Sequence, residues 1–151
     1  MTSRDELAAA QERLVRALVA GADPPPGFDA VRLEAAARAL LHKRAGEVAR
    51  SWPGLAAAYG ARWSSVFAGW AAGRPSRGSW LDGWDFARAD RASLAYDGVV
   101  ELAGCEVNWS RRAGGHPVRR RVALRRIPGG VVVQVLGRTK AINRSPAQDP
   151  R

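Results

Sequence analysis

The sequence contains few of the residue types on which most metal and redox sites depend. Its 151 residues include one cysteine, Cys105, and two histidines, His42 and His116. A single cysteine excludes an intrachain disulfide and a cysteine-based zinc set, and it suits a reducing cytosol. Neither histidine has a cysteine or a second histidine at metal-ligand spacing. We therefore expect no metal site and no cofactor.

Long apolar runs and lysine are also scarce. No run approaches the roughly 20 apolar residues of a membrane span, and the start, MTSRDELAAAQER, has acids where a signal peptide is apolar. We expect a cytoplasmic protein that does not contact membranes. Lys43 and Lys140 are the only lysines among 24 basic residues, the rest being arginine. In a chain rich in alanine and glycine this is typical of a GC-rich genome, so the net charge of +10 is weak support for a polyanionic partner.

The amino-acid composition of the sequence changes near residue 90. Residues 90–151 hold 12 basic and 5 acidic residues, against 12 and 9 in residues 1–89, and five of the six tryptophans precede residue 90. We predict a helical domain over 1–89, a small module of one helix and a β-hairpin over 90–139, and a disordered tail over 140–151. The expected fold class is α+β, mainly α.

Apolar residues at helical spacing predict a bundle of about five helices before residue 90. Prolines at 24–26 separate the first two helices, and Pro53 suits the first position of a short third one. The expected helices span about 3–21, 29–50, 53–59, 62–72 and 80–88, and a sixth follows at about 95–109.

Aromatic side chains recur at steps of three and four residues within these helices. Rings at such spacing are typical of a packed core, and a ring-lined ligand pocket is the alternative interpretation. The expected core residues are Trp52, Pro53, Trp63, Phe67, Trp84 and Phe86.

Two segments rich in β-branched and other apolar residues, VRRRVALRRI and VVVQVL, flank Pro128–Gly130 and predict two strands joined as a hairpin. We expect its apolar side to face the helices. That side carries Val122 and Leu124 on the first strand and Val131, Val133 and Val135 on the second.

No set of residues predicts an enzyme. Asp82 and Asp85 form the most conspicuous carboxylate pair, but both fall in the first turns of a predicted helix, where the helix dipole favours negative charge. Cys105 lies on the apolar stripe of the sixth helix, so we interpret it as a small core residue and not a nucleophile.

The chain resembles a known family over residues 5–90. The resemblance is carried by Arg44, Trp52, Pro53, Leu55, Gly60, Phe67, Trp70, Pro75, Leu81, Gly83 and Phe86. These positions are similar to the N-terminal helical domain of the partner proteins of multinuclear non-haem iron-dependent oxidative enzymes, the bufferin and methanobactin type. That domain is commonly labelled DNA-binding. The short form here, rich in alanine and arginine, resembles an actinobacterial branch.

The resemblance implies a non-catalytic role. In such pairs the enzyme holds the iron and oxidises cysteines of a small precursor peptide, while the partner binds the enzyme and helps to present the peptide. The implied partners are a neighbouring multinuclear iron-dependent oxidase and its precursor peptide. Larger members have a bigger mixed C-terminal domain, whose place is taken here by residues 90–151.

A hairpin offers a mechanism for presenting a peptide, because its edges carry unpaired backbone groups to which an extended peptide can add as a further strand. Arginines beside that edge suit acidic side chains, since a guanidinium group binds a carboxylate at two points. Equally, such charges keep an exposed edge from aggregating. The residues expected to contact a partner are Arg119, Arg121, Arg125, Arg126, Trp70, Val132 and Gln134.

Nucleic-acid binding of a regulatory type is the alternative. The helices at 53–59 and 62–72 superficially resemble a helix-turn-helix, with the basic hairpin as a wing. The second of these helices, however, offers only Arg62, Ser64 and Ser65 as polar side chains near its start, whereas a recognition helix needs polar groups toward the groove.

Overall fold

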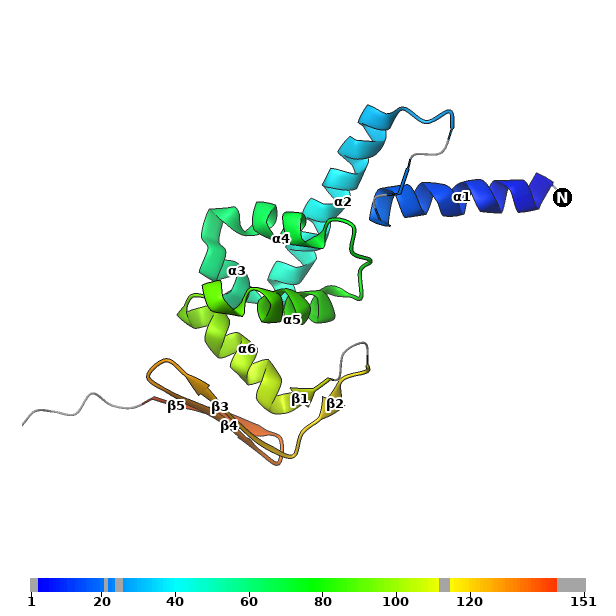
Figure 1. Cartoon of the computed structure of the whole chain (residues 1–151). Helices are drawn as coiled ribbons and strands as arrows, with labels where there is room; N and C mark the ends of the chain where they lie inside the picture. Colours follow the sequence, from blue (N-terminus) through cyan, green and yellow to red (C-terminus); the bar gives the residue numbers. More distant parts are fainter. Residues whose placement is uncertain (1–2, 21, 24–25, 112–114, 144–151) are drawn as a thin grey trace, which may run out of the picture.

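Figure 1 shows the computed structural model, which describes residues 3–20, 22–23, 26–111 and 115–143. Most of the proline stretch after the first helix lies outside the described residues. So do residues 144–151 of the predicted tail.

All the helices predicted from apolar spacing are present, each within two residues of the expected bounds. They are α1 (Ser3–Ala20), α2 (Ala30–Ser51), α3 (Pro53–Tyr59), α4 (Trp63–Ala71), α5 (Ser79–Ala89) and α6 (Tyr96–Asn108), with 3-10 turns at Gly60–Arg62 and Arg91–Ser93. The strands are β1 (Trp109–Ser110), β2 (Val118–Arg119), β3 (Val122–Ile127), β4 (Gly130–Val135) and β5 (Arg138–Asn143). The fold class is therefore α+β and mainly α, as predicted.

Strand β5, which adds a third strand to the predicted hairpin, was not predicted. Residues 140–143, assigned to the disordered tail from the sequence, belong to this strand, so the expected hairpin is a three-stranded antiparallel sheet in the order β3-β4-β5. Leu136 and Gly137 form the two-residue turn and have φ values of +48° and +88°. That conformation suits a tight hairpin. Leucine seldom adopts it, and this is why the turn is not apparent in the sequence.

An aromatic core holds the helices together. Phe86 on α5 lies at its centre, with ring centroids of Tyr59, Trp63, Phe67 and Trp70 all 5.5–5.6 Å away. Of the six residues expected in the core, five are buried: Trp52, Trp63, Phe67, Trp84 and Phe86.

Pro53, the sixth, is exposed, contrary to the prediction. It occupies the first position of α3, where a residue without an N–H group costs no hydrogen bond and burial is not required.

The aromatic core extends past the boundary predicted at residue 89. Leu102 of α6 is 1% exposed within the same cluster, and α6 packs against α3 and α5. Glu101, also on α6, accepts a hydrogen bond from the Leu55 N–H at 2.7 Å and so caps the start of α3. Burial raises the pKa of Glu101, and its bonds to backbone N–H groups partly offset that shift.

A buried ion pair joins α2 to α5. Arg44 Nε donates to Asp82 Oδ2 at 2.8 Å, and the two side chains are 11% and 2% exposed. Asp82 also accepts from the Ser76 hydroxyl and the Arg77 N–H, while Arg44 Nη1 donates to the carbonyl of Arg74. The pair therefore fixes the loop between α4 and α5 onto α2.

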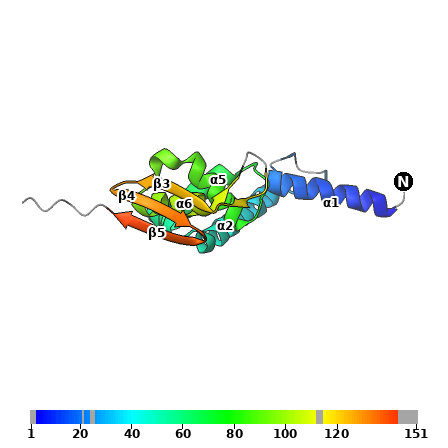
Figure 2. The same cartoon turned by 90° about the horizontal axis from the view of Figure 1, so that it is seen from below.

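The three-stranded sheet packs on α6 through the face opposite to the one predicted. Ile127 on β3 and Val132 and Gln134 on β4 are buried, whereas Val122 and Leu124 are 67% and 52% exposed. Ile127 and Val132 form a second apolar cluster with Ala103 and Val107 of α6. Figure 2 shows the three strands in front of α6, with no other described element covering them.

Every helix in the described part of the chain is too short or too polar to cross a bilayer.

Candidate functional site

Two surface features could bind another molecule, and both lie around the C-terminal strands. Strands β1 and β2 pair as an antiparallel ribbon. One feature is a pocket between α5, α6 and this β1-β2 ribbon, which we call the arginine pocket. The other is the uncovered side of the three-stranded sheet, which we call the outer sheet face.

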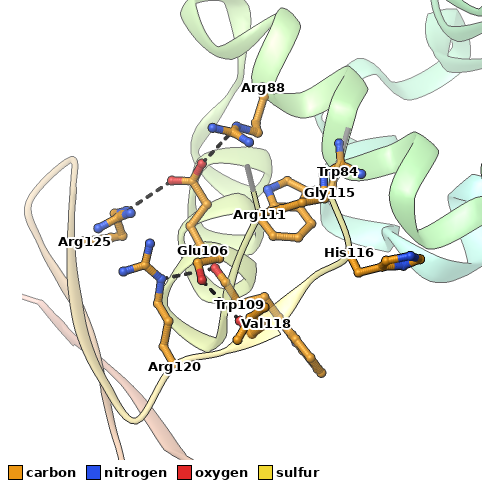
Figure 3. A pocket seen from close by; sticks show the side chains of 11 residues that line it. Trp84, Arg88, Glu106, Trp109, Arg111, Gly115, His116, Val118, Arg120 and Arg125 are labelled. Carbon is orange, nitrogen blue, oxygen red and sulfur yellow. Dashed lines mark hydrogen bonds and ion pairs between the residues drawn. The ribbon is translucent and has the colours of Figure 1, made fainter. Parts of the chain in front are cut away.

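The arginine pocket has a volume of about 500 Å³. Figure 3 shows its side chains converging from α5, α6, the ribbon and β3. The residues that line the pocket are Trp84, Arg88, Glu106, Trp109, Ser110, Arg111, Gly115, His116, Val118, Arg120 and Arg125. Four arginines thus line the pocket together with one acidic residue.

Glu106 is the acidic residue, and its side chain is 8% exposed. Its carboxylate oxygens form ion pairs with guanidinium nitrogens of Arg88 at 3.5 Å, Arg91 at 3.4 Å and Arg125 at 3.2 Å. Glu106 lies on the sheet-facing side of α6, where Arg125 on β3 reaches it. This pairing explains why the sheet turns Arg125 inward and Val122 and Leu124 outward.

Arg111 lies in the pocket wall, with a side chain 4% exposed. Its Nη2 atom pairs with Asp85, and its guanidinium carbon lies 5.5 Å from the Trp84 ring centroid. The buried Nε and Nη1 atoms have no hydrogen-bond partner among the described residues, and neither has the Trp84 Nε1 atom. Unsatisfied buried donors are rare in folded proteins and point to a partner outside the described residues.

Arg120 also lines the pocket and is half-buried. Its Nε atom donates to the carbonyl of Trp109 at 3.3 Å. Within the described ranges no carboxylate forms an ion pair with Arg120, so its charge is not neutralised by the part of the chain that the structure describes.

The outer sheet face is apolar at its centre and basic around it. Cross-strand register places Leu124 opposite Val133, and Val133 opposite Lys140. The complete face comprises Val122, Leu124 and Arg126 on β3, Val131, Val133 and Val135 on β4, and Arg138, Lys140 and Ile142 on β5. Val122, Leu124, Val135 and Ile142 are each 47–67% exposed. A contiguous exposed apolar patch with a polar rim is typical of a protein interaction site.

The structure separates the arginines that were expected to act together. Arg125 faces α6 and lines the arginine pocket, whereas Arg126 lies on the outer sheet face. Arg119 is exposed, with its guanidinium carbon 5.1 Å from the Trp109 ring centroid. Arg121 is exposed just before β3.

Three further residues expected to contact a partner lie elsewhere. Val132 and Gln134 are each 2% exposed, because their side of β4 packs on α6, so the prediction that they meet a partner is wrong. Gln134 Nε2 donates to the carbonyl of Arg120 at 3.1 Å. Trp70 is half-buried on α4, packs edge-on against Phe86, and lies apart from the hairpin.

Sequence reasoning missed Arg111, Glu106 and Trp109 as site residues. One signal was available, because an acidic residue occupies a position on the apolar stripe of α6. Such a residue needs a cationic partner when it is buried. Its partners lie 15 to 19 residues away along the chain or on another helix, so spacing does not identify them.

Cys105 is half-buried and faces the aromatic core. Burial, together with the nearby carboxylates of Glu106 and Glu101, raises the pKa of its thiol to about 12. The thiolate is the reactive form, so we expect iodoacetamide to alkylate the native chain at pH 8 about a thousandfold more slowly than the chain unfolded in guanidinium chloride. Mass spectrometry over time measures both rates. Equal rates in the two states would contradict this account and indicate an activated cysteine.

In the described part of the chain, no three His, Cys, Asp or Glu side chains form a group that could hold a metal ion. His42 on α2 lies with its Nδ1 atom 2.6 Å from the Ser64 hydroxyl, and His116 is exposed at the mouth of the arginine pocket.

Comparison with known proteins adds two findings. A protein of Streptomyces avermitilis, named UPF0276 protein, is 38% identical over 128 residues, which cover 82% of this chain and 26% of that protein. The chain therefore spans about a quarter of the length of the curated relative that it matches. No solved structure matches it.

The second finding concerns a family model described as "SCO6045-like, C-terminal domain", which matches residues 8–92. This match covers α2 to α5, which contain most of the aromatic core. More than half of the sequence is included, and the chain therefore belongs to the SCO6045-like C-terminal domain family.

Proposed function

We propose that this chain is a non-catalytic adaptor that binds a metal-dependent peptide-modifying oxidase and helps to present its precursor peptide. The observation that carries the proposal is the outer sheet face, which remains uncovered while the opposite face of the same strands is packed on α6. The type of partner is proposed from the resemblance of residues 5–90 to adaptor proteins of multinuclear iron-dependent oxidases.

Exposed side chains on the outer sheet face would supply much of the binding free energy. Fully burying a valine, leucine or isoleucine side chain contributes roughly 1.5–3 kcal/mol. The exposed members Val122, Leu124, Val135 and Ile142 lie on three adjacent strands and form one surface. Arg126, Arg138 and Lys140 on the same face favour a partner whose complementary surface has acidic groups around an apolar centre.

The Streptomyces relative supports a role beside a larger partner. The matching segment is about a quarter of that protein, so a domain similar to this chain is covalently joined there to roughly three times as much additional polypeptide. Domains joined in one polypeptide commonly pack against each other through surfaces like those between separate subunits. In this proposal the outer sheet face is such a surface.

Strand addition remains the proposed route for holding an extended peptide. In the predicted hairpin β4 would have had a free edge. Strand β5 pairs with that edge, so the edge strands of the sheet are β3 and β5. A peptide that adds beside β3 would run next to Arg125 and the mouth of the arginine pocket.

Co-expression with the proposed partner, a multinuclear iron-dependent oxidase, tests the proposal. The parent chain is expected to copurify with the tagged oxidase and to co-elute from a size-exclusion column. The variant Leu124→Glu is expected to weaken the complex at least about a hundredfold, because it places a carboxylate within an apolar interface.

Val31→Glu is the matched control, because it also replaces an exposed apolar side chain by a carboxylate. Val31 is 75% exposed and lies on α2, away from the sheet. It is expected to bind as the parent does. Failure of the parent chain to form any complex would refute the adaptor role, and equal binding of Leu124→Glu and the parent would refute the assignment of the outer sheet face.

Nucleic-acid binding receives less support from the arrangement of side chains. On α4, the helix that would enter a DNA groove, the exposed positions are Ser65 and Gly69. Two small residues offer few contacts to base edges. A titration with duplex DNA at two salt concentrations tests this alternative, because phosphate contacts make affinity fall steeply with salt.

A further inference from the structure

We propose that the arginine pocket binds a carboxylate of an acidic peptide. The inference deepens the proposed function, since it takes peptide presentation as its starting point and names the chemical group that is recognised. It rests on residues other than those of the outer sheet face.

The charge of the pocket is the first argument. Glu106 is surrounded by Arg88, Arg91 and Arg125, three cations for one carboxylate. Arg111 is paired with Asp85, which Arg77 also contacts at 3.5 Å. Arg120 adds a cation with no ion-pair partner among the described residues. The walls therefore carry more positive charge than their own acids neutralise, and an anion entering the pocket is favoured.

The unsatisfied donors are the second argument. The buried Nε and Nη1 atoms of Arg111 and the Nε1 atom of Trp84 lack acceptors in the described ranges. Leaving a buried donor unpaired costs more than forming an ordinary hydrogen bond gains, particularly for a charged group. An acceptor supplied by a ligand, reached by a small shift of the pocket wall, removes that cost.

The apolar part of the pocket suits the stem of an acidic side chain. Trp84 and Trp109 lie beside the cationic groups, and Val118 on β2 also lines the pocket. Trp109 is held by its contacts with Trp80 at 5.6 Å between ring centroids and with Arg119 on the ribbon. Rings next to guanidinium groups can hold the methylene groups of glutamate while its carboxylate meets the arginines.

Glu106 favours a carboxylate over a phosphate group. Its own carboxylate is buried in the wall of the pocket, so a ligand shares the space with one negative charge. A singly charged carboxylate meets less repulsion there than a doubly charged phosphate does. The recessed position between α5, α6 and the ribbon also admits a projecting side chain more readily than the backbone of a duplex.

Binding of synthetic peptides to the full chain tests the inference without the oxidase. The probe is a fluorescein-labelled decapeptide with two internal glutamates and an amidated C-terminus, and fluorescence anisotropy reports its binding. Two further arms identify the source of the carboxylate: the same peptide with both glutamates changed to glutamine, and that glutamine peptide with a free C-terminus. A labelled 12-base-pair DNA duplex is the fourth probe.

The variants Arg120→Gln and Arg50→Gln remove one positive charge each. Arg120 lines the pocket, whereas Arg50 is exposed in the last turn of α2 and lies outside it. We expect the glutamate peptide to bind the parent chain and to bind Arg120→Gln about tenfold more weakly, the loss of one charge-assisted hydrogen bond. Binding to Arg50→Gln should equal that of the parent.

Three outcomes would overturn the inference. They are binding of the amidated glutamine peptide as tight as that of both carboxylate-bearing peptides, equal loss of affinity in the two variants, and binding of the DNA duplex more tightly than of every peptide. A normal complex with the oxidase together with any of these results would leave the adaptor role standing and remove only the carboxylate site. Binding of the free-terminus glutamine peptide alone would assign the site to a C-terminal carboxylate.

Discussion

Replacing Asp82 with alanine is expected to lower the free energy of unfolding by about 3–5 kcal/mol, because the change leaves the cation of Arg44 in the protein interior without its partner. Arg44 is 11% exposed and cannot recover full hydration without moving. The variant also removes the acceptor of the Ser76 hydroxyl and of the Arg77 N–H, which hold the loop between α4 and α5. Urea denaturation followed by circular dichroism measures the change.

Asp97→Ala is the control that separates this ion pair from a helix-dipole effect. Asp97 is an exposed acid in the first turn of α6, as Asp82 is an acid in the first turn of α5. Losing a favourable dipole contact at an exposed site costs about 0.3–1 kcal/mol. If Asp82→Ala destabilises the chain no more than Asp97→Ala does, the buried pair contributes little and the dipole interpretation from the sequence is sufficient.

Gly83→Ala is expected to destabilise the chain by about 3 kcal/mol, the upper end of the usual cost of overpacking a core. A Cβ atom at position 83 would lie 2.2 Å from Trp52 Cδ1 and 2.4 Å from Trp52 Nε1. The indole cannot give way easily, because it is 2% exposed and its Nε1 atom donates to the carbonyl of Trp80 at 2.9 Å. Thermal or urea denaturation shows the loss, and near-ultraviolet circular dichroism shows the displaced ring.

Gly69→Ala makes the matching change where the structure has room. Gly69 is an exposed glycine on α4, and a Cβ atom there would meet nothing within 4 Å. Alanine is favoured over glycine in a helix by about 1 kcal/mol, so this variant is expected to be more stable than the parent. Equal effects at positions 69 and 83 would contradict the close packing of α5 against the end of α2.

The helical part of the fold follows from short-range rules. Spacing of apolar residues, Asp29 at the start of α2 and Pro53 at the start of α3 are local signals, and they mark the ends of the helices correctly. The Asp29 carboxylate accepts from the Val31 N–H at 2.9 Å, as an N-cap residue does.

The sheet was harder to predict because its sequence fits either orientation. In VALRRI one alternate set is Val122, Leu124 and Arg126, and the other is Ala123, Arg125 and Ile127. Hydrophobicity favours the first set for the core, but the buried carboxylate of Glu106 requires Arg125 on the inner side. The choice depends on a contact between β3 and α6, which no window of sequence contains.

The candidate sites depend on the same long-range pairings. Once Arg125 turns inward, the larger apolar residues of β3 become the outer sheet face, and the inward arginine completes the pocket around Glu106. Asp82 is a similar case, because its partner Arg44 lies 38 residues earlier. Its position in a first helical turn indicated only a favourable contact with the helix dipole, whereas the structure places it in a buried ion pair.

The affinity of the proposed partner oxidase for the parent chain, for Leu124→Glu and for Val31→Glu is the most direct test of the proposal that the outer sheet face is an interface. Isothermal titration calorimetry on the purified proteins measures all three. The parent and Val31→Glu are expected to bind tightly, and Leu124→Glu is expected to bind at least about a hundredfold more weakly. Three equal affinities would contradict it, and so would the absence of binding by the parent chain.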